Sequence, residues 1–350
     1  MDTLTHALSG ALMARAVVPA RPAYATRADC VALGFLAAAF PDSDVVLSYV
    51  SPLAYLHYHR GVTHSLLLLP LWAFLLAWVW SRLRRRREAF RSYLLVAVLG
   101  IGMHILGDLI TSFGTMIFAP LTDLRVAWNT TFIIDPWLSG IVAIALLAAA
   151  LFRGSRIPAL LGVAALCGYI GFQALQRQRA IDVGEAHARS QSLEQASVSA
   201  LPRPVSPFNW MVIVDTPGTY HYSFVNLRRS QVRQIGADDG FIARLDAPYR
   251  PVAMARWETV TKLGDGVDRA LAEQAFQQPA FRFFRWFAAY PVLAAVERGN
   301  PSECVWFQDL RFLTPGRDGW PFRYGMCREN SGPWQPYQAL APGESIALSR

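Results

Sequence analysis

The sequence predicts an all-α, polytopic membrane bundle of about six helices, followed by an α+β, strand-rich extracytoplasmic domain. Residues 1 to about 175 contain long apolar runs, whereas the rest of the chain has the composition of an ordinary soluble protein. This shift explains why 53% of the 350 residues are hydrophobic overall. We therefore expect a membrane-embedded domain at 1–180, a stalk at 181–206 and the α+β domain at 207–350.

Four segments approach the length of about 20 apolar residues that a membrane span requires. They are 62–80, 92–110, 138–152 and 157–175. Two further segments, 4–18 and 30–41, are shorter and rich in alanine and glycine. Their composition favours small-residue helices that pack inside a bundle over helices that face lipid.

The arginines orient these helices. The net charge is +8, but the basic residues gather in three loops, so a nucleic-acid partner is not expected. These loops contain Arg15, Arg21 and Arg27; the run "SRLRRRRE" at 81–88 with Arg91; and Arg153 and Arg156. By the positive-inside rule they face the cytoplasm, and both termini lie on the other side of the membrane.

Histidines and carboxylates gather at the opposite rim. Of the seven histidines, five lie in the first 104 residues, and the six-helix path brings them all to this rim. Several carboxylates join them there. The residues are Asp2, His6, Asp42, Asp44, His57, His59, His64, His104 and Asp108.

The pair in "HILGD" is the most informative member of this group. The i, i+4 spacing puts His104 and Asp108 on one helix face. A carboxylate within an apolar span costs about 2.5–3.5 kcal/mol, so it usually faces a polar partner or a cavity. A simple interhelical His–Asp pair is the alternative to a metal site.

The other rim residues also have ordinary explanations when each is taken alone. Asp2 can complement a helix dipole, Asp42 and Asp44 in "FPDSD" can form a capped turn, and His59 and His64 can be interfacial anchors. Together, imidazoles and carboxylates from four helices are the donors that a divalent ion such as zinc binds. One or two ions at this rim would suit hydrolysis of a phosphoester, with Arg60 binding a phosphate or carboxylate oxygen.

The motifs "DTLTHALSGAL", "FPDSD", "HRGVTHS" and "HILGDLITSFGT" also resemble, in this order, the inner-membrane-associated metal-dependent hydrolase family, which is also called YdjM-like. The resemblance covers roughly 1–180, and the family is similar to the zinc-dependent phospholipase C and single-strand nuclease superfamily. It implies an N-terminal zinc ligand at His6 and a main site of Asp42, His64 or His59, His104 and Asp108. The pair of residues that would hold a third zinc ion in that superfamily has no counterpart here, so at most two ions are expected.

The resulting hypothesis is a membrane-bound hydrolase acting on a lipid or small-molecule phosphoester, with Arg60, Asp44 and Asp108 as catalytic residues. The rival hypothesis is a non-enzymatic metal-binding or ion-transport protein, which would need ligands near the membrane midplane and a path on both sides. A third is a membrane scaffold for the C-terminal domain. Asp135, in the loop before 138–152, can either orient a ligand histidine or cap the helix that follows.

The C-terminal half contains strand patterns and no recognisable catalytic group; His187 and His221 are isolated. A hairpin is expected around Pro217 and Gly218. The aromatic stretch 281–291 either belongs to the core or rests on a membrane surface, and we favour the core.

Four cysteines are present, without metal-binding spacing. Cys30 and Cys167 fall in apolar helices, whereas "ECVWFQDLRFL" and "WPFRYGMC" read as two strands joined by a turn-rich linker. An antiparallel pairing of these strands places Cys304 and Cys327 at one open end, where a disulfide is expected in an oxidising compartment.

The arginine pattern makes a testable topology prediction. A reporter fused after Thr122 or after Arg350 should report an extracytoplasmic location, and one inserted between Arg84 and Arg87 a cytoplasmic location. Paired phosphatase and fluorescent-protein fusions would measure both. The opposite pattern would place the polar rim in the cytoplasm.

Overall fold

The computed structural model describes residues 1–350 except 237, 300–301, 316–320, 331, 342 and 349–350. Its contacts divide the chain into two compact units. The first comprises 1–50, 58–177 and 202–207, and the second comprises 51–57, 178–201 and 208–350. Each unit is described by itself.

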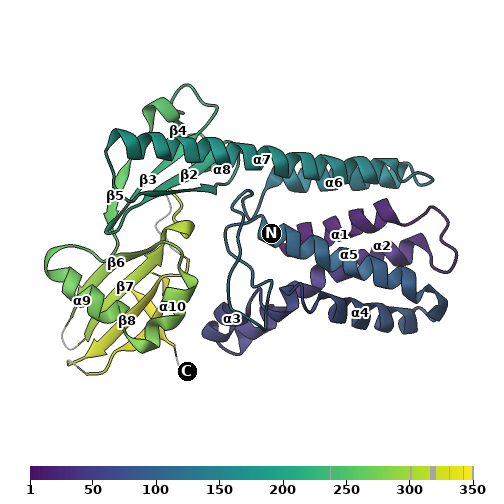
Figure 1. Ribbon diagram of the computed structural model, residues 1–350, viewed down its shortest axis with the longest axis horizontal. Coiled ribbons are helices and arrows are strands. Elements are labelled where there is room, and N and C mark those ends of the chain that lie inside the picture. Colours follow the sequence, from purple (N-terminus) through teal and green to yellow (C-terminus); the bar gives the residue numbers. More distant parts are fainter. Residues whose placement is uncertain (237, 300–301, 316–320, 331, 342, 349–350) are drawn as a thin grey trace. The chain divides into compact units, whose positions relative to one another are not determined.

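The first unit is a bundle of helices, drawn in purple to teal in Figure 1. Its helices are α1 (Thr3–Val17), α2 (Arg27–Ala39), α4 (Leu69–Leu83), α5 (Phe90–Leu109), α6 (Pro136–Leu151) and the N-terminal part of α7 (Ile157–Ser190). 3₁₀ turns at Phe40–Tyr49, Val62–His64 and Arg87–Ala89 complete this unit, whereas the short helix α3 (Pro52–Tyr58) belongs to the second unit apart from Tyr58. The six predicted helical segments are thus present, with shifted bounds.

Fewer than the six predicted helices have the length and hydropathy of a membrane span among the residues that the structure describes. Three are long and apolar enough to cross a membrane: 27–49, 87–109 and 157–190. A fourth is possible if Pro52–His64 and Leu69–Leu83, which meet at 76°, form one broken span. The remaining helices, α1 and α6, have only 15 and 16 residues.

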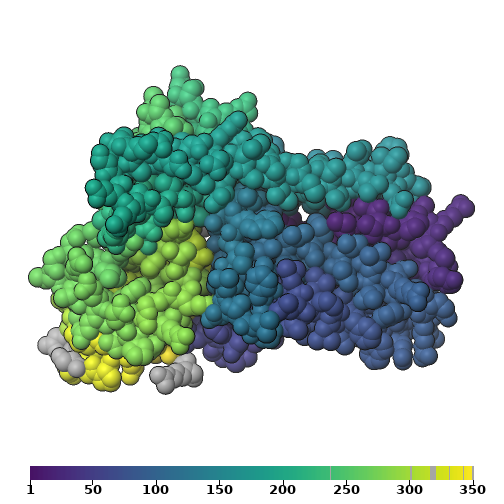
Figure 2. Space-filling model, in the orientation of Figure 1, coloured from purple at the N-terminus to yellow at the C-terminus, as the bar shows by residue number. Residues whose placement is uncertain are grey.

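Glycines bring α1, α2 and α5 into close contact. A Cβ atom at Gly10 would lie 2.3 Å from the Gly34 carbonyl oxygen, and one at Gly34 would lie 2.6 Å from the Gly10 carbonyl oxygen. At Gly100 a Cβ atom would approach Ala37 Cβ to 2.9 Å. Only glycine permits helix backbones to approach this closely, so the prediction of small-residue packing is confirmed. Figure 2 shows the purple and blue helices packed closely together.

The three arginine-rich loops meet at one end of this bundle. Arg15 and Arg27 donate to carbonyls at the C-terminal end of α6, and Arg156 donates to the Val17 carbonyl of α1. Asp29 forms an ion pair with Arg84 from the α4–α5 loop. The expectation that these loops share one side is confirmed.

The described residues of the second unit form two five-stranded sheets. The first has the order β1-β2-β3-β4, with β5 also paired to β3, and the second is an antiparallel meander ordered β10-β9-β8-β7-β6 (Figure 1). The strands are β1 (Ser197–Pro202), β2 (Asn209–Asp215), β3 (Thr219–Asn226), β4 (Arg250–Pro251), β5 (Glu258–Thr261), β6 (Pro291–Arg298), β7 (Ser302–Asp309), β8 (Tyr324–Glu329), β9 (Gln335–Ala341) and β10 (Glu344–Ala347). Three helices, α8 (Phe241–Asp246), α9 (Gly266–Phe276) and α10 (Arg282–Phe287), join them.

The segment expected to be a stalk has a different structure. Helix α7 continues to Ser190, and β1 follows at Ser197. Gly184 lets the helix lie directly against the first sheet, because a Cβ atom there would come within 2.7 Å of Val198 and Val212 side-chain carbons. The second unit therefore starts earlier than the expected boundary at 207.

Two further predictions for the second unit are confirmed. Strands β2 and β3 form an antiparallel hairpin around the turn with Pro217 and Gly218, in which Asp215 faces Tyr220. Phe281, Phe284 and Phe287 of the aromatic stretch are at most 2% exposed, so this stretch belongs to the core.

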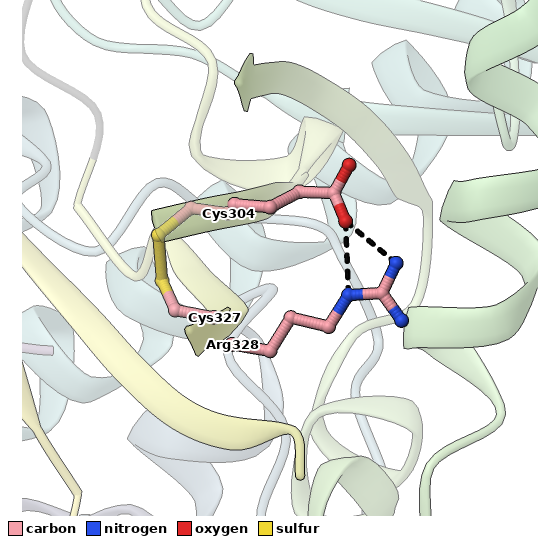
Figure 3. The surroundings of a disulfide bond; sticks show 4 residues. Cys304, Cys327 and Arg328 are labelled. Atoms are coloured by element: carbon pink, nitrogen blue, oxygen red, sulfur yellow. Dashed lines mark hydrogen bonds and ion pairs between the residues drawn. A yellow bond between two sulfur atoms is a disulfide. The ribbon is translucent and has the colours of Figure 1, made fainter. Parts of the chain in front are cut away.

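The predicted disulfide is present. Cys304 in β7 and Cys327 in β8 stand directly opposite each other, with Cα atoms 4.1 Å apart (Figure 3). Glu303 and Arg328, which are also register partners, form an ion pair beside the bond. Cys30 and Cys167 are free.

Replacing both Cys304 and Cys327 by alanine should lower the stability of the second unit by about 3 kcal/mol, as expected for a loop of this length. Urea unfolding followed by tryptophan fluorescence would measure the change. The matched control is Cys30→Ala and Cys167→Ala, which leaves the bond intact. A double variant as stable as this control would mean that the bond does not form in the native protein.

Candidate metal centre

Four side chains converge at the end of the helical bundle that is opposite the three arginine-rich loops. Asp42 lies in the 3₁₀ turn after α2, His64 ends the turn before α4, and His104 and Asp108 lie near the C-terminus of α5. One ligand atom from each lies within 4.8 Å of all the others. Three of the four residues are fully buried, and Asp42 is 15% exposed at its side chain.

The separations between these atoms suit a small cation. His64 Nε2 and His104 Nε2 are 2.9 Å apart. His64 Nε2 lies 3.7 Å from Asp42 Oδ1 and 3.2 Å from Asp108 Oδ2, and His104 Nε2 lies 3.5 Å and 3.6 Å from the same atoms. Tetrahedral zinc, with bonds of about 2.0–2.2 Å, would separate its ligands by about 3.3–3.6 Å.

Hydrogen bonds orient both imidazoles toward the centre of this group. His104 Nδ1 lies 2.6 Å from the Ala38 carbonyl oxygen, which can only accept, so Nδ1 carries a proton. His64 Nδ1 lies 3.0 Å from Thr63 Oγ1 and 3.6 Å from Asp44 Oδ2. If Nδ1 carries the proton in both neutral rings, the two Nε2 lone pairs face each other.

Lone pairs that face each other at this distance repel unless a cation or a proton lies between them. Asp108 Oδ2 points to the same place and accepts no hydrogen bond from the described residues, although it is completely buried. A buried carboxylate oxygen without a donor is costly. The four residues therefore fit a divalent ion.

The other oxygen of Asp108 is held by three groups. Asp108 Oδ1 lies 2.8 Å from the Met1 amino nitrogen, 3.1 Å from His6 Nε2 and 3.0 Å from Arg60 Nη2. These contacts fix the carboxylate and leave Oδ2 directed at the two histidines. Asp42 is held similarly, because Thr3 Oγ1 donates to its Oδ2 at 2.6 Å.

His6, expected as a ligand, lies beside the four-residue group. Its ring stacks on that of His104, with centroids 3.8 Å apart, and its Nδ1 is buried without a hydrogen bond. Gly107 makes room for the ring, since a Cβ atom there would lie 2.9 Å from His6 Cε1. His6 therefore contacts Asp108 on the side away from His64.

The structure distinguishes the two histidines of "HRGVTH". His64 belongs to the four-residue group, whereas His59 Nδ1 pairs with Asp44 Oδ1 at 2.9 Å. Asp44 Oδ2 accepts hydrogen bonds from the backbone nitrogen of Arg60 and from Thr63 Oγ1. Asp44 therefore links His59 to the loop that carries His64.

Arg60 does not have the exposed position expected of a substrate-binding fork. It is 3% exposed, and Nη1 donates to Thr111 Oγ1 while Nη2 contacts Asp108. Its backbone has a φ of 60°, in the left-handed region, which turns the chain between α3 and the turn that carries His64. Its charge is thus directed at Asp108.

Two other rim residues have different positions. Asp135 is the N-cap of α6, because Oδ1 accepts from the backbone nitrogens of Trp137 and Leu138, and its Oδ2 accepts from the Tyr169 hydroxyl. Of the two roles considered for Asp135, these hydrogen bonds support the helix cap. His57 belongs to the second unit, where its ring lies 4.9 Å from that of Trp286, and it is not one of the four residues of the group.

Several groups that shape the site were not predicted. They are the hydroxyls of Thr3 and Thr63, the carbonyl of Ala38 and the space left by Gly107. Thr111 donates to the Asp108 carbonyl and accepts a hydrogen bond from Arg60. Of these groups, only Thr63 could have been identified from the sequence, because it directly precedes His64.

These features define a helical membrane protein with a buried group of histidines and aspartates that could bind a metal ion. The chain belongs to the family described as YdjM inner membrane protein, which matches residues 1–180. It is also 29% identical over 154 residues to a Bacillus subtilis protein named "Uncharacterized protein YfhP". That match covers 42% of this chain and 46% of the relative, so the chain spans about half the relative's length. No solved structure matches the chain.

His104→Ala and Asp108→Ala should each remove the bound ion, because each deletes one of the four ligands. Asp44→Asn should weaken metal affinity by about tenfold, as expected for a residue that orients a ligand. Metal content of the purified protein, measured by inductively coupled plasma mass spectrometry, would test this. His221→Ala in the second unit is the matched control, and full metal content in His104→Ala would exclude the site.

Proposed function

We propose that this protein is a membrane-bound, metal-dependent hydrolase that acts on phosphoesters, with a zinc-like ion held by Asp42, His64, His104 and Asp108. The observation that carries the proposal is the pair of Nε2 atoms 2.9 Å apart beside a buried carboxylate oxygen that accepts no hydrogen bond from the described residues. When bound, the ion would supply Lewis-acid chemistry, which polarises a phosphoryl oxygen and makes water more acidic. The motif resemblance to metal-dependent hydrolases agrees with this.

The residues around the four ligands have positioning roles in the proposal. Asp44 and Thr63 orient His64, and the Ala38 carbonyl orients His104. Arg60 and His6 hold Asp108 from its other oxygen, and Arg60 adds positive charge next to a site that receives an anionic substrate. Asp42 is the most exposed ligand, so substrate would approach from its side.

Depth along the helices favours hydrolysis over ion transport. His104 and Asp108 lie in the last six residues of α5, Asp42 follows α2, and His64 precedes α4. The ligands thus lie at one end of the helices, not at their middle. A transporter needs a binding site near the midplane that can open to both sides, whereas a hydrolase of lipid phosphoesters needs a site at the level of the head groups.

Purified protein loaded with zinc should hydrolyse a phosphodiester such as bis(p-nitrophenyl) phosphate or a short-chain phosphatidylcholine, and p-nitrophenyl acetate should be a much poorer substrate. His104→Ala should reduce the rate by at least about 100-fold, because removing a ligand abolishes the metal chemistry. Release of p-nitrophenol or of the phosphorylated head group would be measured.

His221→Ala, which lies outside the site, should retain the wild-type rate. A zinc-loaded protein that hydrolyses neither phosphoester, or whose activity survives in His104→Ala, would refute the proposal. Transport of zinc into proteoliposomes by the wild type, lost in His104→Ala, would instead assign the site to the rival function.

A further inference from the structure

A second site candidate lies at the opposite end of the helical bundle, where three arginines surround the ends of two helices. Arg15 Nη2 donates to the carbonyls of Ala149, Phe152 and Arg153 at 2.8, 3.2 and 3.2 Å. Arg27 Nη1 donates to the same Arg153 carbonyl at 2.8 Å. Two guanidinium groups therefore meet at one oxygen atom.

The third arginine approaches from the next loop. Arg156 Nη1 donates to the Val17 carbonyl at 3.1 Å, and Arg27 Nη2 lies 3.4 Å from the neighbouring Val18 carbonyl. Carbonyls at helix C-termini attract cations, so these bonds explain part of the arrangement. They supply only partial negative charge, equivalent to about half an elementary charge for each helix.

The three arginines have no carboxylate partner. No ion pair joins Arg15, Arg27 or Arg156 to an acidic group of the described residues. Asp29, which is two residues beyond Arg27 on α2, is already paired with Arg84 and Arg86. Three formal positive charges are thus concentrated without a matching anion from the protein.

Two guanidinium nitrogens of this cluster lack a hydrogen-bond acceptor among the described residues. Arg15 is only 8% exposed, and its Nη1 is buried without a hydrogen-bond partner among the described residues. Arg27 Nε is also buried without a hydrogen-bond partner among the described residues. A buried guanidinium nitrogen without an acceptor is costly, so the cluster is incomplete in both charge and hydrogen bonding.

Exposed apolar side chains lie in and beside the connection that carries Arg156. Leu151, Phe152, Ile157 and Leu161 are between 62% and 72% exposed. Phe152 and Ile157 flank Arg153 and Arg156 in the short connection between α6 and α7. A ligand that combines a phosphate with hydrocarbon chains could contact both kinds of surface.

We propose that Arg15, Arg27 and Arg156 form a binding site for a phosphate group, supplied by an anionic phospholipid or by free inorganic phosphate. Guanidinium groups bind phosphate oxygens through paired charge-assisted hydrogen bonds. Basic pockets between membrane helices bind anionic lipid head groups in this way. The site is separate from the His/Asp group, which uses other residues.

The test measures binding to the full-length protein in neutral detergent micelles. Short-chain phosphatidylglycerol, short-chain phosphatidylcholine and inorganic phosphate are titrated separately, and binding is followed by native mass spectrometry and by the shift in melting temperature. Phosphatidylglycerol should bind at least about tenfold more tightly than phosphatidylcholine, because several arginines each contribute to anion affinity. Phosphate binding as tight as that of phosphatidylglycerol would identify the free anion as the ligand.

The double variant Arg27→Gln/Arg156→Gln should lose this preference by about tenfold or more. It leaves Arg15 in place, because the loss of that buried cap could unfold the end of α6. Arg85→Gln/Arg87→Gln removes the same charge from exposed arginines of the α4–α5 loop and should keep the wild-type affinity. His104→Ala should also keep it.

Equal affinity for all three ligands, or an unchanged preference in Arg27→Gln/Arg156→Gln, would overturn the proposal. An equal loss in the two arginine double variants would overturn it too, because it would show that net charge, and not this cluster, attracts the anion.

Discussion

The burial of the Asp108 carboxylate is the constraint on which the rest of the helical bundle depends. A carboxylate completely removed from water is tolerated only with compensating charge and hydrogen bonds. Its Oδ1 receives them from His6, Arg60 and the Met1 amino group, which belong to two other segments of the chain. Its Oδ2 faces the Nε2 atoms of His64 and His104. The positions of α1, of α5 and of the loop before α4 are therefore all set by one side chain.

Small residues make this arrangement possible. The ends of α1, α2 and α5 can hold their polar groups at hydrogen-bonding distance only because Gly10, Gly34 and Gly100 let the three backbones approach closely along their length. Gly107 serves the same purpose at the site itself, where the His6 ring occupies the space of a side chain. The helices that pack most closely are thus the ones that carry the polar residues of the site. The glycines contribute no apolar side chains, and close contact between the helix backbones offsets this loss.

The sequence predicted the site better than it predicted the spans. Asp42, His64, His104 and Asp108 could be brought together because helix ends and i, i+4 spacing restrict where a polar side chain can lie. The apolar run that begins at Leu66 becomes helical only at Leu69, with Pro70 in the first turn, and a sharp bend precedes this helix. Hydropathy alone could not reveal this bend. It also could not show that α7 continues beyond its apolar part. The residues that extend it, Ala180 and Gly184 among them, are retained in the helix by packing on β1 and β2, which are distant in sequence.

The separation of the ligand-holding segments along the chain imposes an order on assembly. His6 and Asp108 are 102 residues apart, and α1 is made first. At about 5–20 residues per second, α1 waits on the order of 5–20 s before the end of α5 is synthesised. During that interval a partly made bundle has His64 and Asp42 but neither His104 nor Asp108. The four-residue group is therefore complete only after α5 has been made and packed, so a metal ion could bind it only when the bundle itself is nearly complete.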